Sequence, residues 1–192
     1  MRSSLSRDHL FFRDFMIIKK AEDYVKPQYH EGFFKHHILI VKKCALDLAE
    51  QLGGNKEIIE LAVLFHDSTV SDENKDHNIT GATNAENFLQ SENYPEEKIQ
   101  HVKDCILTHR FRDKIPESLE AKILASADAE AHFKTFPYIA YFYIKKKGAE
   151  DAFKVLREKI NRNWNKKMLP ESKEKVKEHY EIINKMLLTL GA

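Results

Sequence analysis

Residues 61–67 read Leu-Ala-Val-Leu-Phe-His-Asp, five apolar residues followed at once by a histidine and an aspartate. A helix with such an apolar run packs into a protein interior, and the run carries His66 and Asp67 inward with it. A buried carboxylate is costly unless it is paired, hydrogen-bonded or bound to a cation. The stretch therefore predicts a helix that ends in a polar site, and a metal ion would satisfy its carboxylate.

Apolar residues on both sides of this stretch recur every three or four positions, the spacing of amphipathic helices. One helix is expected to open at His37 and to stop at a Gly-Gly pair, with apolar positions Ile38, Val41, Ala45, Leu48 and Leu52. Asn55 is expected to cap a second helix at 56–67, and the polar residues 71–78 predict a loop. Further helices are predicted at 80–92, 95–110 and 117–134, with Pro95, Pro116 and Pro137 as punctuation.

The sequence after Pro137 keeps this helical periodicity. An aromatic segment at 138–147 precedes a single stripe formed by Phe153, Leu156, Ile160 and Trp164. A last helix is expected from about Pro170 as an outer layer, with one apolar side formed by Ile182, Ile183, Met186, Leu187 and Leu190. Period-two alternation and Asn-Gly hairpin signals do not occur in the sequence. The chain is therefore predicted to be all-α.

Composition narrows the class of protein. The 31 Lys and Arg residues nearly balance 30 Asp and Glu for a formal net charge of +1, so no nucleic-acid or membrane partner is expected. Cys44 and Cys105 stand among apolar residues and are expected to be buried thiols rather than a disulfide. The sequence shows no signal-peptide pattern and no run of membrane-spanning length. These features predict a cytoplasmic protein.

Two more residues join the His-Asp pair as candidate metal ligands. His37 opens a predicted helix, and Asp128 follows the apolar residues 123–125. The candidates would come from three separate helices, as in metal sites built into the cores of helical bundles. Imidazole nitrogens and carboxylate oxygens suit a divalent ion such as Mn, Fe, Co, Ni, Zn or Mg.

The order His37, His66-Asp67, Asp128 resembles the HD-domain superfamily of metal-dependent phosphohydrolases, over roughly residues 34–135. The segments that carry the likeness are the first helix at 37–41 with Ala45, the signature helix at 61–67 and the final acidic element at 123–128. The pair Ser68-Thr69 departs from the family, in which many members have an apolar residue and a glycine after the His-Asp pair.

This resemblance implies an HD-domain helical bundle whose four ligands, His37, His66, Asp67 and Asp128, bind one metal ion. It also implies one domain, residues 1–192, with a signature core at about 34–135 and additional C-terminal helices at about 138–190.

Two further segments are similar to those that supply the histidines of a second ion in two-metal members of the family. They are His77-Asn-Ile-Thr-Gly-Ala and Ile-Leu-Thr-His109. Asp67 would then bridge the ions and carry the chemistry. Arg110 and Arg112 follow His109 and are candidates for binding the substrate's phosphate, although such arginines are more often solvated charges.

Several residues compete for places at this site. His36 is an alternative to His37, although the spacing to Val41 and Ala45 favours His37. His30 and His101 could reach the site, but surface positions are commoner for such residues. Glu130 and His132 lie within a helical turn of Asp128 and could support it. An aromatic group could wall a base-binding pocket, or belong to the core as aromatic stripes usually do: Phe133, Phe136, Tyr138, Tyr141, Phe142 and Tyr143.

The leading functional hypothesis is a metal-dependent phosphohydrolase acting on a nucleotide or other small phosphorylated metabolite. The same six candidate ligands would also suit a di-iron oxygenase, since oxygenases share this fold. A third hypothesis is a non-catalytic, metal-containing ligand sensor. The sequence leaves open the substrate, the metal and its stoichiometry, and the oligomeric state, including a homo-oligomer.

Overall fold

A computed structural model describes residues 7–70, 76–112 and 114–190, which form helices and no β-strand. The all-α prediction is confirmed. The α-helices are α1 (Arg7–Val25), α2 (Glu31–Phe33), α3 (Leu39–Leu52), α4 (Lys56–Phe65), α5 (His77–Ser91), α6 (Glu96–Thr108), α7 (Leu119–Lys134), α8 (Phe136–Lys147), α9 (Ala149–Arg162) and α10 (Pro170–Thr189). A 3-10 turn, η1 (Lys26–Gln28), and two π-helical turns, η2 (Phe34–Ile38) and η3 (Asn163–Lys167), join them. Within the described residues, no helix is long and apolar enough to cross a membrane.

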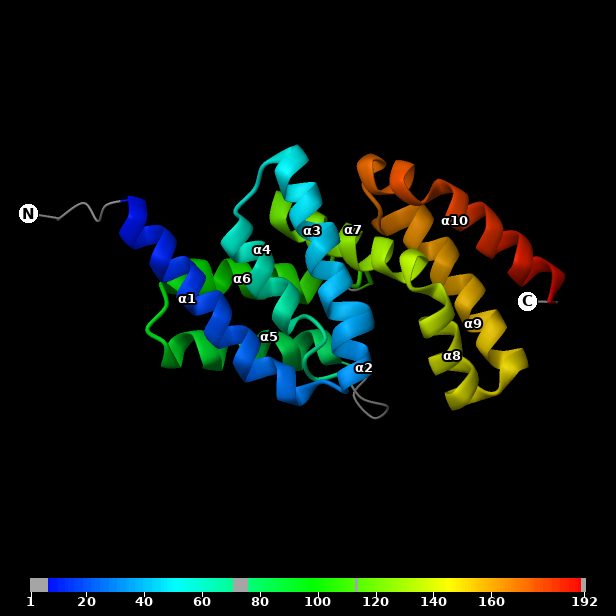
Figure 1. The fold of residues 1–192 in the computed structure, drawn as a ribbon, viewed down its shortest axis with the longest axis horizontal. Helices are drawn as coiled ribbons and strands as arrows, with labels where there is room; N and C mark the ends of the chain where they lie inside the picture. Colours follow the sequence, from blue (N-terminus) through cyan, green and yellow to red (C-terminus); the bar gives the residue numbers. More distant parts are fainter. Residues whose placement is uncertain (1–6, 71–75, 113, 191–192) are drawn as a thin grey trace, which may run out of the picture.

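Helix α4 lies at the centre of the N-terminal body and contacts α1, α3, α5, α6 and α7 (Figure 1). The Asn55 side chain caps it by accepting a hydrogen bond from the Ile58 amide at 3.3 Å, as predicted. The helix ends at Phe65, two residues before the predicted end. The Ser68 amide donates to the Phe65 carbonyl at 3.1 Å, which turns the chain and leaves His66 and Asp67 at the helix terminus.

Helix α1 was not anticipated from the sequence, and its buried residues explain how it packs. Ile17, Ala21 and Val25 are spaced four apart and face the main core beside α4. This spacing is typical of the apolar side of an amphipathic helix, although the alanine makes that side only weakly hydrophobic.

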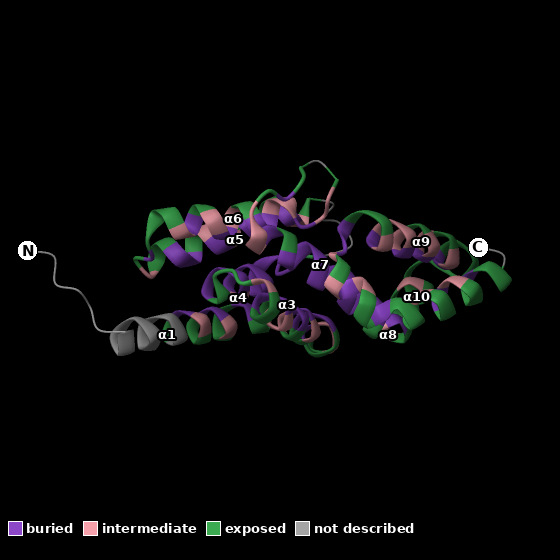
Figure 2. Ribbon diagram, turned by 90° about the horizontal axis from the view of Figure 1, so that it is seen from above, coloured by how far each residue is buried: buried purple, intermediate pink, exposed green. Residues whose placement is uncertain are grey.

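Two clusters of buried side chains form the core, and α7 belongs to both. The larger cluster surrounds α4 and contains both cysteines, which are free and buried as predicted. The smaller cluster includes Phe133 of α7 and buried residues of α8, α9 and α10. Figures 1 and 2 show α8, α9 and α10 as a separate group to one side, connected to the body through the buried length of α7.

The prediction of one buried apolar side for α10 is only partly confirmed. Ile183 and Leu187 are buried, whereas Ile182 is 68% exposed and Met186 and Leu190 are also exposed. Neighbouring helix positions point about 100° apart, so one narrow contact with α7 and α9 cannot bury both Ile182 and Ile183. In α9 the predicted stripe holds better, since Leu156 and Ile160 are buried.

Helix α5 begins at His77, three residues earlier than predicted, so the end of the predicted loop is helical. The amides of Ile79 and Thr80 both donate to the Asp76 carbonyl and form the first turn. The prediction of a loop up to residue 78 was wrong because the first turn of α5 is polar, since it faces a polar site instead of the core. The other part of the predicted loop, residues 71–75, lies outside the described residues.

Gly81 allows α5 to lie directly against the end of α4. A Cβ atom at this position would lie 2.8 Å from the Phe65 carbonyl oxygen and 3.3 Å from that of His66. Those are backbone atoms, which cannot turn aside as a side chain can. The contact holds His77, one helical turn before Gly81, beside the His66-Asp67 pair.

Replacing Gly81 by alanine is expected to lower the free energy of unfolding, because the added methyl group forces the two backbones apart at a cost of about 2–3 kcal/mol. This cost exceeds the gain of about 1 kcal/mol in helix propensity. Urea denaturation measures the change, and Asn87→Ala at an exposed position of α5 is the control. Wild-type stability for Gly81→Ala would show that the backbones are not in close contact.

Candidate metal centre

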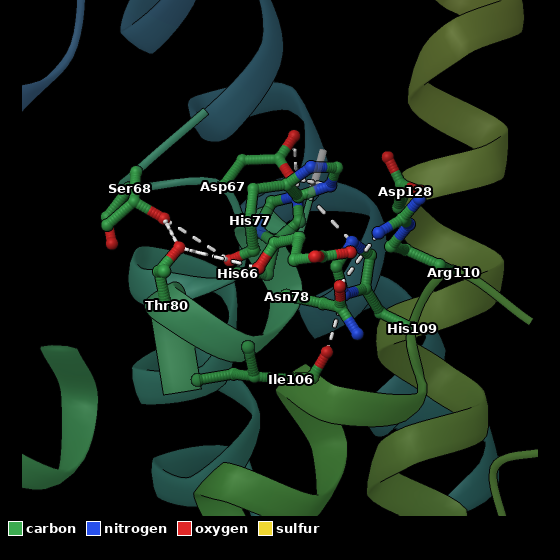
Figure 3. A network of polar contacts seen from close by, with 12 residues as sticks. His66, Asp67, Ser68, His77, Asn78, Thr80, Ile106, His109, Arg110 and Asp128 are labelled. Carbon is green, nitrogen blue, oxygen red and sulfur yellow. Dashed lines mark hydrogen bonds and ion pairs between the residues drawn. The ribbon is translucent and has the colours of Figure 1, made fainter. Parts of the chain in front are cut away.

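The six candidate ligands lie together, although they come from five different places in the fold. Figure 3 shows five of them converging: His66 and Asp67 after α4, His77 at the start of α5, His109 after α6 and Asp128 in α7. The sixth, His37, lies in η2 and is only 1% exposed. They form two groups, and in each group the ligand atoms lie within 4.8 Å of one another. The groups are His37 with His66 and Asp128, and Asp67 with His77 and His109.

Asp67 lies between the two groups and faces both. Its Oδ2 is 3.5 Å from the Nε2 atoms of His37 and His66. Its Oδ1 is 3.4 Å from Nε2 of His77 and 3.6 Å from Nε2 of His109. Two ligands at about 2.1 Å from one ion lie roughly 3.0–3.4 Å apart. The spacings are therefore close to those of ligands that share an ion.

Backbone hydrogen bonds orient two of the imidazoles. His66 Nδ1 lies 2.7 Å from the Val63 carbonyl oxygen, and His109 Nδ1 lies 2.6 Å from that of Ile106. Both carbonyls belong to the last turn of a helix, where carbonyl groups lack intrahelical partners. A proton on Nδ1 satisfies each carbonyl and leaves the Nε2 lone pair directed at the site, which is the usual arrangement of a metal-binding histidine.

Several buried polar atoms at this site have no hydrogen-bond partner among the described residues. They are Nδ1 and Nε2 of His37, Nε2 of His66 and Oδ1 of Asp67. Buried polar atoms are nearly always hydrogen-bonded, so a cluster of unsatisfied ones needs an explanation. Imidazole and carboxylate donors suit divalent transition metals and Mg. The two groups can therefore hold divalent ions.

The electrostatics of the metal-free site keep most of these groups in their ligand forms. Burial lowers the pKa of His66 to about 4, so its imidazole is neutral at pH 7. Burial acts to raise the pKa of Asp67, but the imidazoles of His66, His109 and His37 outweigh it and hold that pKa well below its usual range. His37 behaves differently: burial acts to lower its pKa, and the neighbouring carboxylates of Asp128 and Asp67 raise it overall.

A cavity of about 220 Å³ opens beside the two groups. Asp67, His77, His109 and Asp128 lie in its wall, together with Arg110 and Arg112. Arg110 donates to Asn78 Oδ1 at 2.8 Å, which holds its guanidinium beside His109 (Figure 3). The cavity wall thus combines candidate metal ligands with cationic side chains.

Three cationic cavity residues from the C-terminal part of the chain were missed in the sequence. Lys159 and Arg162 belong to α9, and Lys167 of η3 donates to Asp128 Oδ2. Lys159 follows the buried Leu156 by three positions, so the helical period did contain a signal for it. No periodic signal marks Lys167, because its π-helical turn departs from the 3.6-residue repeat.

A family model described as HD domain matches residues 34–132, just over half of the chain. The chain belongs to the HD-domain superfamily. An uncharacterized protein from Clostridium beijerinckii is 36% identical to this HD protein over 104 residues. That match covers 50% of the chain and 64% of the relative, so less than two thirds of the relative's length is represented.

Two crystal structures share the fold of this HD protein. One is an HD-superfamily hydrolase from Bacillus thuringiensis, with a TM-score of 0.70 and 22% identity, covering 92% of this chain and 96% of that one. The other is the Lin1889 protein from Listeria innocua, with a TM-score of 0.70 and 18% identity, covering 93% and 96%. At these identities the likeness shows the fold alone.

The competing histidines occupy other places in the HD protein. His36 is exposed, whereas His37 is buried in the site. His30 caps α2 by accepting from the Gly32 amide at 3.2 Å. His101 pairs with Glu120 at 3.2 Å and does not line the cavity.

His132 lies beside the site, with Nδ1 3.5 Å from Asp128 Oδ1 and 3.3 Å from the Asn163 amide nitrogen. Glu130 is buried and pairs with Lys134 instead. The aromatic residues divide between the core, the cavity wall and the surface. Phe133 and Phe136 belong to the smaller core cluster, whereas Tyr141 is exposed. The cavity wall includes Tyr138, Phe142 and Tyr143.

The metal-free HD protein is expected to lose stability as the pH falls from 6.5 toward 4. The unfolded chain binds a proton at His66 in this range and the folded chain does not, so acidification favours unfolding. The His66 contribution amounts to up to about 3 kcal/mol, and the lowered pKa of His77 acts in the same direction. The raised pKa of His37 offsets part of the loss.

The free energy of unfolding of chelator-treated protein, measured with urea at pH 7.5, 6.0 and 5.0, checks this prediction. Bound metal should hold the ligands deprotonated and delay the loss to lower pH. A metal-free protein that becomes more stable on acidification would contradict the assignment of a neutral, buried His66.

Proposed function

We propose that this HD protein is a metal-dependent phosphohydrolase that acts on a nucleotide or other small phosphorylated metabolite. The observation that carries the proposal is Asp67, whose two oxygens face two groups of candidate ligands beside a cavity lined by lysine and arginine. His37, His66, Asp67 and Asp128 would hold one ion, and His77 and His109 with Asp67 would hold a second. The likeness in fold to the HD-superfamily hydrolase from Bacillus thuringiensis supports the hydrolase class.

Divalent ions, when bound, would supply Lewis-acid stabilisation of a phosphoryl group and lower the pKa of a bound water to make it nucleophilic. The protein's own residues would do the rest. Arg110 and Arg112 would bind phosphoryl oxygens through charge-assisted hydrogen bonds. Lys167 would fix the orientation of Asp128, to which it donates. The aromatic rings in the cavity wall would exclude water from the charged groups.

The test is release of phosphate or pyrophosphate by purified protein reconstituted separately with Mg, Mn, Fe, Co, Ni or Zn. The panel should include nucleoside mono-, di- and triphosphates and sugar phosphates. We expect turnover with at least one metal and one phosphorylated substrate. The proposal fails if no metal supports release from any member of the panel.

The same experiment separates the two competing functions. Protein that binds two irons under anaerobic conditions and consumes oxygen with a substrate would be an oxygenase. Protein whose metal only raises stability, with no turnover of any kind, would be a ligand sensor. The cationic cavity wall favours the phosphohydrolase, because lysine and arginine are the residues that bind phosphate.

A further inference from the structure

Helix α9 brings two cationic side chains to the cavity from outside the segment that matches the HD model. Lys159 and Arg162 are three residues apart, close to one helical turn, and both line the cavity. The family match ends at residue 132, so these residues belong to the C-terminal helices that follow the matched segment. They add to the phosphate-binding candidates Arg110 and Arg112.

Lys159 and Arg162 form no ion pair with the residues that the structure describes, although the charges of Asp128 and Asp67 act on Lys159 and favour its cationic form. Among the same residues, the buried Nε atom of Arg162 has no hydrogen-bond partner. Both side chains are partly buried. Burial lowers the pKa of each, which reflects the cost of holding a cation away from water. Buried cations are normally paired, so these two are suited to an anion that enters the cavity.

Lys167 differs from them, because its ammonium already donates to Asp128. Arg110 is likewise held by Asn78 at the end of the cavity beside His109. A phosphoryl group at the candidate metal groups would therefore meet Arg110, while Lys159 and Arg162 remain available for further negative charge.

The size of the cavity limits what it can enclose. Its volume of about 220 Å³ is below the roughly 300–1,000 Å³ of pockets that bury a whole drug-sized ligand. Small charged groups would occupy the interior, and the organic part of a substrate would remain at the mouth. Phe142 and Val70 line the cavity and are 48% and 40% exposed, so they can contact that organic part.

We propose that Lys159 and Arg162 form an anion subsite for a second phosphoryl group, which makes substrates with two adjacent phosphoryl groups preferred over monophosphates. The proposal rests on the proposed function in placing the first phosphoryl group at the Asp67 site. It adds the substrate class, a di- or triphosphate, and the residues that select it.

Calorimetric binding of inorganic pyrophosphate and inorganic phosphate tests the subsite without turnover. We expect pyrophosphate to bind at least about tenfold more tightly than phosphate, because two charge-assisted hydrogen bonds are added. The double variant Lys159→Gln/Arg162→Gln should lose most of that preference while its phosphate affinity changes by less than about threefold. Lys154→Gln is the matched control, since Lys154 is exposed on α9 and pairs with Glu150.

Measurements on both metal-loaded and metal-free protein separate binding at the subsite from binding by metal. The preference should persist, at weaker affinity, in the metal-free protein. Arg162→Lys keeps the charge and should retain part of the preference, and it replaces the double variant if that one does not fold. Equal effects of the double variant on phosphate and pyrophosphate, or no effect on either, would overturn the subsite.

Kinetics distinguish failure of this subsite from failure of the proposed function. A protein that binds pyrophosphate through Lys159 and Arg162 but hydrolyses nothing would retain the subsite and lose the function. A protein that hydrolyses monophosphates as well as diphosphates, with kcat/KM unchanged in the double variant, would retain the function and lose the subsite.

Discussion

Replacing Asp67 by alanine is expected to empty both candidate metal groups and to reduce turnover by at least about 1,000-fold. Among the residues that the structure describes, the Asp67 carboxylate alone faces four imidazoles, with Nε2 distances of 3.4–3.6 Å to His37, His66, His77 and His109. Its removal takes a ligand from each group and the negative charge that attracts the ions. Metal analysis of protein purified without chelator, together with the activity assay, measures both effects.

Asp104→Ala is the control for this change, because Asp104 is an exposed aspartate on α6 outside the cavity. It should keep wild-type metal content and activity. Circular dichroism should show that Asp67→Ala keeps its helices, since the apolar contacts of α4 are unaltered. Tight metal binding by Asp67→Ala would mean that the central ligand has been misassigned.

Replacing His109 by alanine is expected to remove about one ion per chain and to lower turnover by at least about 100-fold. His109 belongs to the group with Asp67 and His77, whereas His37, His66 and Asp128 form the other group. The first group should therefore lose its ion and the second should keep its own. Metal content per chain, compared with that of Asp67→Ala, shows whether the two groups are occupied separately.

His101→Ala is a matched control on the same helix. His101 lies on α6, the helix that ends directly before His109. It pairs with Glu120 and does not line the cavity. Its replacement should leave metal content and turnover unchanged. Loss of both ions in His109→Ala would show that the two groups fill together, and unchanged content would exclude His109 as a ligand.

The helical class and the position of the His66-Asp67 pair could be predicted from local sequence, because helical periodicity and a polar pair after an apolar run are local patterns. The apolar run at 61–65 placed the His66-Asp67 pair at the end of a buried helix, and the all-α architecture followed from the same spacing. The resemblance to the HD domain assigned six candidate ligands, and the structure brings all six together. Their roles as ligands remain predictions until metal is measured.

Local sequence failed where one residue's environment depends on distant parts of the chain. The helix at Arg7–Val25 and the exposed side of α10 depend on which neighbours cover them, and periodicity alone does not reveal neighbours. The start of α5 was misplaced because its polar first turn faces a site instead of the core.

Sequence by itself determined the helical class and the residue types suited to hold a metal ion. Tertiary structure decided that Asp67 faces both groups, that backbone carbonyls orient His66 and His109, and that α9 places Lys159 and Arg162 in the cavity. The physical reason is that helix propensity and apolar periodicity are properties of residues close in sequence. A shared cavity instead requires atoms from η2, α4, α5, α6, α7 and α9 to lie within a few ångströms, which only packing of the whole chain achieves.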